Sequence, residues 1–229
     1  MTRRPASAAE RAEVAHIPHL LIPPPWEGGV LDLSDDQRHH LERVLRMKVG
    51  DPCTYTDGEG GIGSGRISEA GVERGEERSV PRGRFVTLAV APPDSRDRVR
   101  FLVEKVAELG VARVCWLRTR FSQARPPRVD RARSWAQMAL EQSRGAYLTQ
   151  ISEGWADWND LAGALVVADV GGSEQVVIDG PVVVAVGPEG GWEPGEIPDG
   201  ASRLGLGSRV LRTETAAIVA VFMLLNIGS

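Results

Sequence analysis

Hydrophobic and polar positions beyond about residue 90 alternate between short apolar runs and runs with helical spacing. Apolar runs at 111–117, 165–168 and 182–186 have the length of buried strands. Before the first of these strands, apolar residues recur every three or four positions from Val99 to Leu109, as in a helix that Gly110 ends. This rhythm predicts an α/β domain with a parallel sheet. The other expected elements are a helix over 127–144 with Trp135, Met138 and Ala139 facing inward, a short strand at 203–206, and a last helix capped by Thr213 with its core at 216–225.

The pattern before residue 90 consists of short strands, turns and one helix. Ser34-Asp-Asp-Gln37 resembles a capping box, so we expect a helix from there to about Met47. The glycine-rich segment 57–61 is typical of a hairpin turn between strands at 53–56 and 62–67. Together these features predict a small β-barrel. Its remaining segments are expected to be a polar loop over 73–84 and a strand over 85–90.

Length and composition agree with a cytoplasmic enzyme that has one large domain or two modest ones. Hydrophobic residues make up 42% of the chain, and no apolar run approaches the length of a membrane span. Residues 1–16 carry charge without the apolar core of a secretory signal, so we expect a disordered extension there. Cys53 and Cys115 form no C-x-x-C pair and are interpreted as reduced, partly buried thiols. The expected domains cover 17–88 and 89–229.

Two segments near the C-terminus carry the most specific chemistry. Residues 182–192 and 204–217 each consist of an apolar strand followed by a glycine-rich loop, and the second runs on into the last helix. Parallel strands deliver such loops to the carboxyl edge of a sheet, so the two predict one pocket with two walls. The sequence has neither G-x-G-x-x-G after the first strand nor G-x-x-x-x-G-K-[ST], which argues against a dinucleotide or a nucleoside triphosphate. The alternative for the first loop is a plain tight turn.

These segments resemble a known family. GPEGG at 187–191, followed by LGSRVLRTETAA at 206–217, is similar to the C-terminal half of the RsmE family of 16S rRNA (uracil-N3)-methyltransferases. The likeness extends over about residues 19–228 in the family's order. Further matching segments are HHLERVLRMKVGD at 39–51, EKVAELGV at 104–111 and EQSR at 141–144. The departures are Trp192 in place of a Phe or Leu, Arg144-Gly145 in place of Gly-Arg, and no lysine in PPDS at 92–95.

The resemblance implies a PUA-like N-terminal β-barrel that binds RNA and a C-terminal SPOUT domain with a trefoil knot. It implies S-adenosylmethionine-dependent methylation of N3 of a specific uridine in the 16S rRNA of the small ribosomal subunit, without a metal. In SPOUT proteins the knot loops bind the cofactor and two subunits complete the site, so a homodimer is expected. The expected cofactor-binding residues are Val186, Gly187, Pro188, Glu189, Gly190, Gly191, Leu206, Gly207, Val210, Leu211, Thr213 and Ala216.

Methylation at N3 of uracil requires loss of a proton and stabilisation of the resulting anion. Arg212 is the candidate to place positive charge beside the uracil oxygens, and Glu214 to accept the proton or orient Arg212. The alternative for this pair is an ion pair at a helix start. Glu189 is a third candidate, unless it only holds its loop. Trp192 either stacks on a base or packs the loop.

Charge is unevenly distributed along the chain, whose net charge is −4. Residues 96–144 contain twelve Lys and Arg against five Asp and Glu, whereas residues 145–229 contain three against eleven. The basic block can contact phosphates, because such contacts depend on local rather than net charge. A solvated basic face is the alternative. The RNA-binding candidates are Arg43, Arg46, Lys48 and Arg144, with the arginines of 118–133.

Other functions have less support. His16, His19, His39 and His40 lack the cysteine or carboxylate partners that a tetrahedral metal site needs. A hydrolase is disfavoured because there is no G-x-S-x-G and no histidine in the C-terminal half. Two alternatives remain open: a SPOUT enzyme that methylates the ribose 2′-oxygen, and a non-catalytic RNA-binding factor in ribosome assembly.

Overall fold

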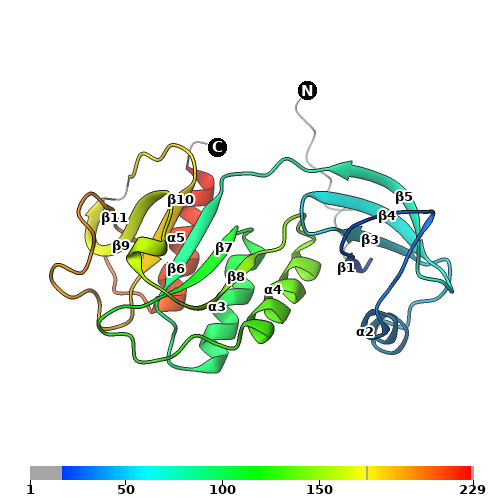
Figure 1. Cartoon of the computed structure of the whole chain (residues 1–229), viewed down its shortest axis with the longest axis horizontal. Coiled ribbons are helices and arrows are strands. Elements are labelled where there is room, and N and C mark those ends of the chain that lie inside the picture. The colour runs from blue at the N-terminus through cyan, green and yellow to red at the C-terminus, as the bar shows by residue number, and fades with distance from the viewer. Residues whose placement is uncertain (1–16, 174, 228–229) are drawn as a thin grey trace. The chain divides into compact units, whose positions relative to one another are not determined.

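The computed structural model describes residues 17–173 and 175–227, so the predicted extension at 1–16 lies outside the described residues. The chain divides into two compact units after Pro81 (Figure 1). The first unit has a curled, open five-stranded sheet in the order β1-β3-β4-β5-β2, antiparallel except where β1 pairs with β3. Its elements are β1 (His19–Leu21), β2 (Val30–Leu31), α2 (Asp35–His39), the π-helical turn η1 (His40–Val44), β3 (Pro52–Thr56), β4 (Gly61–Ile67) and β5 (Val72–Ser79).

The predicted capping box is present at Ser34. The Gln37 backbone N–H donates to Ser34 Oγ at 3.2 Å, and the Ser34 N–H donates to Gln37 Oε1 at 3.0 Å. The helical segment is shorter than predicted, because α2 passes into η1 at His40 and Arg46 takes a left-handed conformation with φ of 56°. A left-handed residue ends a helix before it can reach Met47.

The prediction of a loop over 73–84 is wrong for residues 73–79, which belong to β5, and is confirmed for residues 80–84. Strand β5 pairs with β4 along most of its length, although its side chains after Val72 are almost all exposed. Sheet pairing uses backbone groups and needs no apolar side chain, so a polar sequence was a poor guide here. Tyr55, Cys53 and Leu41 lie in the core beneath this sheet. Burial raises the pKa of the Cys53 thiol to about 11.

The second unit has a six-stranded, fully parallel sheet in the order β11-β9-β10-β6-β7-β8. Chain order reverses at β6: β7 and β8 lie on one side of it, and β10, β9 and β11 on the other. Ligands of such sheets bind at the carboxyl edge near this reversal. The elements are β6 (Val86–Val90), α3 (Arg96–Glu108), β7 (Arg113–Leu117), α4 (Val129–Ser143), β8 (Gln150–Ala156), the 3-10 turn η2 (Trp158–Asp160), β9 (Ala164–Ser173), β10 (Val182–Val186), β11 (Ser202–Leu204) and α5 (Thr213–Asn226).

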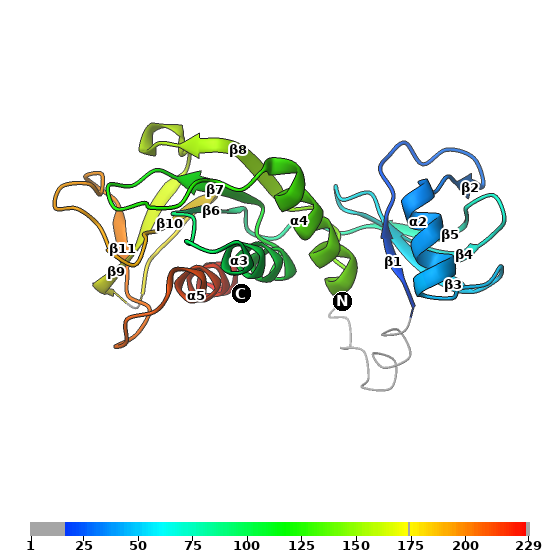
Figure 2. The same ribbon diagram turned by 90° about the horizontal axis from the view of Figure 1, so that it is seen from below.

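Helices α3, α4 and α5 pack on one face of this sheet (Figures 1 and 2). In β10, Val182, Val184 and Val186 face the helices, whereas Val183 and Ala185 face an opposite layer that contains Trp158 and Trp192. Both faces of the strand are buried, which explains its unbroken apolar sequence. The predicted α/β domain is therefore confirmed; the trefoil knot stays a prediction.

Three sequence-based predictions for this unit are wrong. The strand predicted over 85–90 does not belong to the N-terminal barrel, because β6 pairs with β10 and β7 in the parallel sheet. Met138 is 43% exposed rather than inward-facing, since the buried face of α4 runs through Trp135 and Ala139. Arg212, not Thr213, is the N-cap of α5, and the Thr213 hydroxyl is used elsewhere.

Candidate functional site

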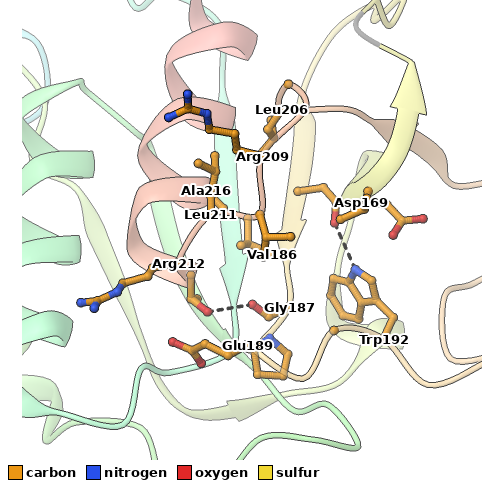
Figure 3. Close-up of a pocket in the computed structure, with 17 residues that line it drawn as sticks. Asp169, Val186, Gly187, Glu189, Trp192, Leu206, Arg209, Leu211, Arg212 and Ala216 are labelled. Atoms are coloured by element: carbon orange, nitrogen blue, oxygen red, sulfur yellow. Dashed lines mark hydrogen bonds between the residues drawn. The ribbon is translucent and has the colours of Figure 1, made fainter.

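A cavity of about 290 Å³ lies at the carboxyl end of β10 and beside the middle of β9 (Figure 3). Its volume is near the lower end of the range for small-molecule sites, about 300–1,000 Å³. Val186, Leu206, Leu211 and Ala216 give it an apolar wall, while charged side chains stand at its rim. The cavity therefore suits a ligand that is partly apolar and partly polar.

Both predicted glycine loops line this cavity. Of the predicted cofactor-binding residues, all except Gly190 lie on its wall, and Arg212 joins them. A third wall, formed by Ala168, Asp169 and Val170 in the middle of β9, was not predicted from the sequence, and neither was Arg209. These three residues follow the apolar run that begins at Leu165 and precede Gly171-Gly172, which was the available signal.

Gly190 is the exception among the predicted cavity residues. A Cβ placed on it would lie 3.2 Å from the Cβ of Phe121, in the loop after β7. Among the described residues, the structure assigns Gly190 to packing between loops rather than to the cavity wall. Its neighbour Gly191 lines the cavity and has φ of +73°, a conformation that favours glycine.

Two hydrogen bonds hold the cavity walls together. The Thr213 hydroxyl donates to the Gly187 carbonyl oxygen at 3.1 Å and so joins the start of α5 to the first loop (Figure 3). The Trp192 indole N–H donates to the Ala168 carbonyl oxygen at 3.1 Å and joins this loop to β9. The Trp192 ring also lies against Gly187, where an added Cβ would be 3.1 Å from the indole. Trp192 thus packs the loop; base stacking by Trp192 stays a prediction.

A cluster of charges lies beside the cavity, centred on Arg98 in the first turn of α3. The Arg98 guanidinium donates to both carboxylate oxygens of Glu214, with Nη2 to Oε2 at 2.6 Å, and also to Glu189. Its Nη1 donates to Asp94 at 2.7 Å. No pattern in the sequence pointed to Arg98. The carboxylate of Glu214 therefore faces Arg98 and is not part of the cavity wall that the described residues form.

Glu214 is buried, with only 8% of its side chain exposed. Burial by itself raises the pKa of a carboxyl group, but the hydrogen bonds from Arg98 and the charges of Arg98 and Arg212 outweigh it. The net result holds the pKa of Glu214 below its ordinary value of 4.5. A carboxylate held in this way is a weak proton acceptor at neutral pH.

We expect Glu214→Gln to change the pH dependence of stability. A carboxyl group whose pKa is lowered in the folded state stabilises the protein above its unfolded pKa, and the effect disappears as pH falls through the folded-state value. The difference in free energy of unfolding between the wild type and Glu214→Gln should therefore be full above the ordinary carboxyl pKa of 4.5 and shrink as the pH falls below it. Urea denaturation across this range measures it. A difference that stays constant with pH would contradict the role of the ionised carboxylate.

Arg212 is exposed and lies at the rim of the cavity. In Figure 3 its side chain starts on the same side of the cavity as Glu189 and its guanidinium points outward, whereas Arg209 stands at the other end near Leu206. Asp169, in the third wall, forms an ion pair with Arg203. The cavity rim thus carries two cationic side chains at separate ends.

The RNA-binding candidates are divided between the two units. Arg43, Arg46 and Lys48 are exposed in the first unit, in and just after η1. Arg144 belongs to the second unit, where it ends α4 with φ of 58° and burial lowers the pKa of its guanidinium. In the basic block, Arg118 lies 3.6 Å from Asp157 and Arg120 lies 3.6 Å from Glu193. Acidic neighbours therefore offset part of that block's charge.

Of the four histidines, His19, His39 and His40 lie among the residues that the structure describes. His19 is buried, and its Nδ1 lies 2.8 Å from Thr54 Oγ1. His39 and His40 are exposed on α2 and η1. Within residues 17–173 and 175–227, no three His, Cys, Asp or Glu side chains cluster in a way that would hold a metal ion.

The fold and the cavity define a parallel α/β domain with a small-molecule site at the carboxyl edge of its sheet. The family described as RNA methyltransferase domain matches residues 81–225, and the RNA methyltransferase PUA domain matches residues 33–73. The first match spans more than half of the chain. The chain therefore belongs to the RNA methyltransferase family.

Relatives and solved structures agree with this assignment. The ribosomal RNA small subunit methyltransferase E of Rickettsia conorii is 27% identical and covers 89% of this chain and 92% of its own. A ribosomal RNA small subunit methyltransferase E from Neisseria gonorrhoeae, solved bound to S-adenosyl methionine, has a TM-score of 0.83 at 24% identity, covering 93% and 98% of the two chains. A putative methyltransferase from Legionella pneumophila, solved with the cofactor SAM, has a TM-score of 0.77 at 25% identity, covering 91% and 96%.

Proposed function

We propose that this protein transfers a methyl group from S-adenosylmethionine to N3 of a specific uridine in the 16S rRNA of the small ribosomal subunit. The observation that carries the proposal is the single cavity lined by both glycine loops, with Arg212 at its rim. Family membership supports RNA methylation, and the names of the relatives support the small subunit as the context. The motifs LGSRVLRTETAA and HHLERVLRMKVGD support the choice of N3 through their resemblance to the RsmE family.

The cavity suits S-adenosylmethionine in size and chemistry. Apolar side chains from Val186, Leu206 and Leu211 can hold an adenine ring, and the glycines permit close approach of backbone donors and acceptors. When bound, S-adenosylmethionine supplies a methyl group activated by its sulfonium charge. The protein's task is then to align the acceptor atom with that methyl group and to exclude water.

The charged residues at the rim have separable tasks in this proposal. Arg212 places positive charge where the uracil anion develops, which is the form of catalysis that stabilises a transition state electrostatically. The carboxylates on the cavity wall are Asp169, which pairs with Arg203, and Glu189, which also accepts a hydrogen bond from Arg98. Glu189 is the candidate proton acceptor. Glu214, ion-paired with Arg98, has a positioning task rather than that of a base.

RNA binding by the first unit is a proposal of its own. We expect Arg43→Ala with Arg46→Ala to weaken RNA affinity and to lower the slope of log affinity against log salt by roughly 1–2, because each lost phosphate contact removes about 0.7–0.9. Cofactor affinity should not change. Filter binding at several salt concentrations measures the slope, and Arg78→Ala, on exposed β5, is the control. An unchanged slope would exclude these arginines from the RNA contact.

Assembly and domain organisation complete the proposal. We place the domain boundary after Pro81, with a PUA-like domain before it and a SPOUT domain after it. A homodimer follows from the resemblance to SPOUT proteins, and the exposed Phe222 on α5 is available to such a contact. Light scattering of the purified protein tests the dimer.

In the described part of the chain, no helix has the length and apolar character needed to cross a membrane. A cytoplasmic location is part of the proposal.

Transfer of labelled methyl from S-adenosylmethionine to small ribosomal subunits that lack native modifications tests the proposed function. Nucleoside analysis should recover the label in 3-methyluridine. Label on a ribose would replace the proposed reaction with 2′-O-methylation. Absence of both methyl transfer and cofactor binding would favour a non-catalytic assembly factor.

A further inference from the structure

The Arg98 guanidinium joins three carboxylates that come from separate parts of the second unit. Asp94 precedes α3, Glu189 follows β10, and Glu214 lies in the first turn of α5. Glu189 belongs to one wall of the cavity, and Glu214 directly follows the Arg212-Thr213 segment of the other. We propose that Arg98 is a positioning residue for methyl transfer, which fixes both loops and prevents Glu214 from capturing Arg212. This inference rests on the proposed function.

The geometry requires an arginine. Nε and Nη2 engage Glu214, Nη2 also engages Glu189, and Nη1 engages Asp94, so every guanidinium nitrogen is used. A planar fork can serve several carboxylates at once, whereas the ammonium of a lysine is a single point of charge. The Arg98 side chain is only 22% exposed, so water screens these contacts less than it screens a surface ion pair.

The link to catalysis runs through Glu214. Its buried carboxylate has two cationic neighbours, Arg98 and Arg212, and both favour its ionised form. Arg98 satisfies this carboxylate, so Arg212, a residue of the cavity lining, does not need to pair with it. If Arg98 were absent, the buried carboxylate would need another partner, and Arg212 is the cation already close to it. Arg212 would then turn from the cavity towards Glu214.

Four variants test the inference. Arg98→Met should lower kcat at saturating cofactor and RNA by about 100-fold, because a misplaced catalytic group has an effect of that size. Affinity for S-adenosylmethionine should fall by less than about 10-fold, because the apolar wall remains. The kcat of Arg98→Lys should lie between those of the wild type and Arg98→Met. Arg100→Met is the control, because it removes an arginine that pairs with Glu104 on the same helix. Its kcat should stay within about twofold of the wild-type value.

The double variant Arg98→Met with Glu214→Gln separates positioning from general loop stability. A neutral amide has little attraction for Arg212, so the double variant should recover about 10-fold in kcat over Arg98→Met. A purely structural role predicts no recovery, because the ties to both loops are still lost. An unchanged kcat in Arg98→Met, or a double variant no better than the single one, would overturn the inference.

A crystal structure of Arg98→Met gives a readout that does not depend on methylation. The inference predicts the Arg212 guanidinium within ion-pair distance of the Glu214 carboxylate, and an Arg212 that still stands at the cavity rim would overturn it. Failure of the proposed function would give a different result from failure of this inference. The wild-type protein would then transfer no methyl group to rRNA, wherever Arg212 lies in the Arg98→Met structure.

Discussion

Replacing Arg212 with methionine should reduce methyl transfer by about 100- to 1,000-fold, the usual effect of removing a group that stabilises charge in the transition state. Arg212 is exposed at the cavity rim and is the N-cap of α5, where it makes no side-chain cap hydrogen bond. Its loss should therefore have little effect on folding. The apolar cavity wall is untouched, so the dissociation constant for S-adenosylmethionine should change by less than about threefold. Single-turnover methylation and calorimetric titration measure the two effects.

Arg209→Met is the matched comparison for Arg212→Met. Arg209 also lines the cavity and is exposed, but it stands at the opposite end, away from Glu189 (Figure 3). If positive charge anywhere on the rim sufficed, the two variants would lose similar activity. A large loss in Arg212→Met alone would assign the stabilising charge to one end of the cavity. Equal activity of Arg212→Met and wild type would remove Arg212 from the mechanism.

Replacing Ala216 with tryptophan should weaken S-adenosylmethionine binding by at least about 100-fold, which corresponds to roughly 2.7 kcal/mol. Ala216 is in the first turns of α5 and faces the cavity, which measures about 290 Å³. An indole projecting from this position would occupy a large part of the space. Since the side chain enters an existing cavity rather than a packed core, the fold should tolerate it.

Thr215→Trp is the control for Ala216→Trp. Thr215 is the preceding residue of α5 and is exposed, so the same indole would point away from the cavity. Its cofactor affinity should be close to that of the wild type. Calorimetric titration with S-adenosylmethionine, together with thermal unfolding of each variant, separates loss of the site from loss of the fold. Tight binding by a folded Ala216→Trp would move the cofactor site elsewhere.

The sequence predicted the two cavity loops well because their signals are local. A glycine-rich loop after an apolar strand has one natural place in a parallel sheet, its carboxyl edge. Residues 186–191 and 206–216 therefore pointed to the same cavity without knowledge of the tertiary structure. Two of the failures concern elements whose sequences lack a clear period. Strand β5 is polar, and the short polar–apolar sequence of β8 gave no clear signal.

Long-range partners were beyond the sequence. Arg98 is separated from Glu189 by 91 positions and from Glu214 by 116, so nothing in the local pattern links them. The sequence paired Glu214 with Arg212, two positions away, as one of its interpretations. In the fold, the carboxylate instead accepts hydrogen bonds from the Arg98 guanidinium of α3. This contact supports the proposed positioning role of Glu214; its role as the base stays a prediction.

The sequence by itself determined the α/β class, the RNA methyltransferase family and the loops that form the cavity, because these depend on periodicity and on glycine-rich motifs read along the chain. Only the tertiary structure decided that β6 belongs to the parallel sheet, that Ala168, Asp169 and Val170 form a third wall, and that Arg98 joins the two loops. Strand pairing and ion pairs join backbone and side-chain groups that are far apart in the chain. Such contacts are fixed by how the strands are ordered in the sheet, which no local pattern specifies.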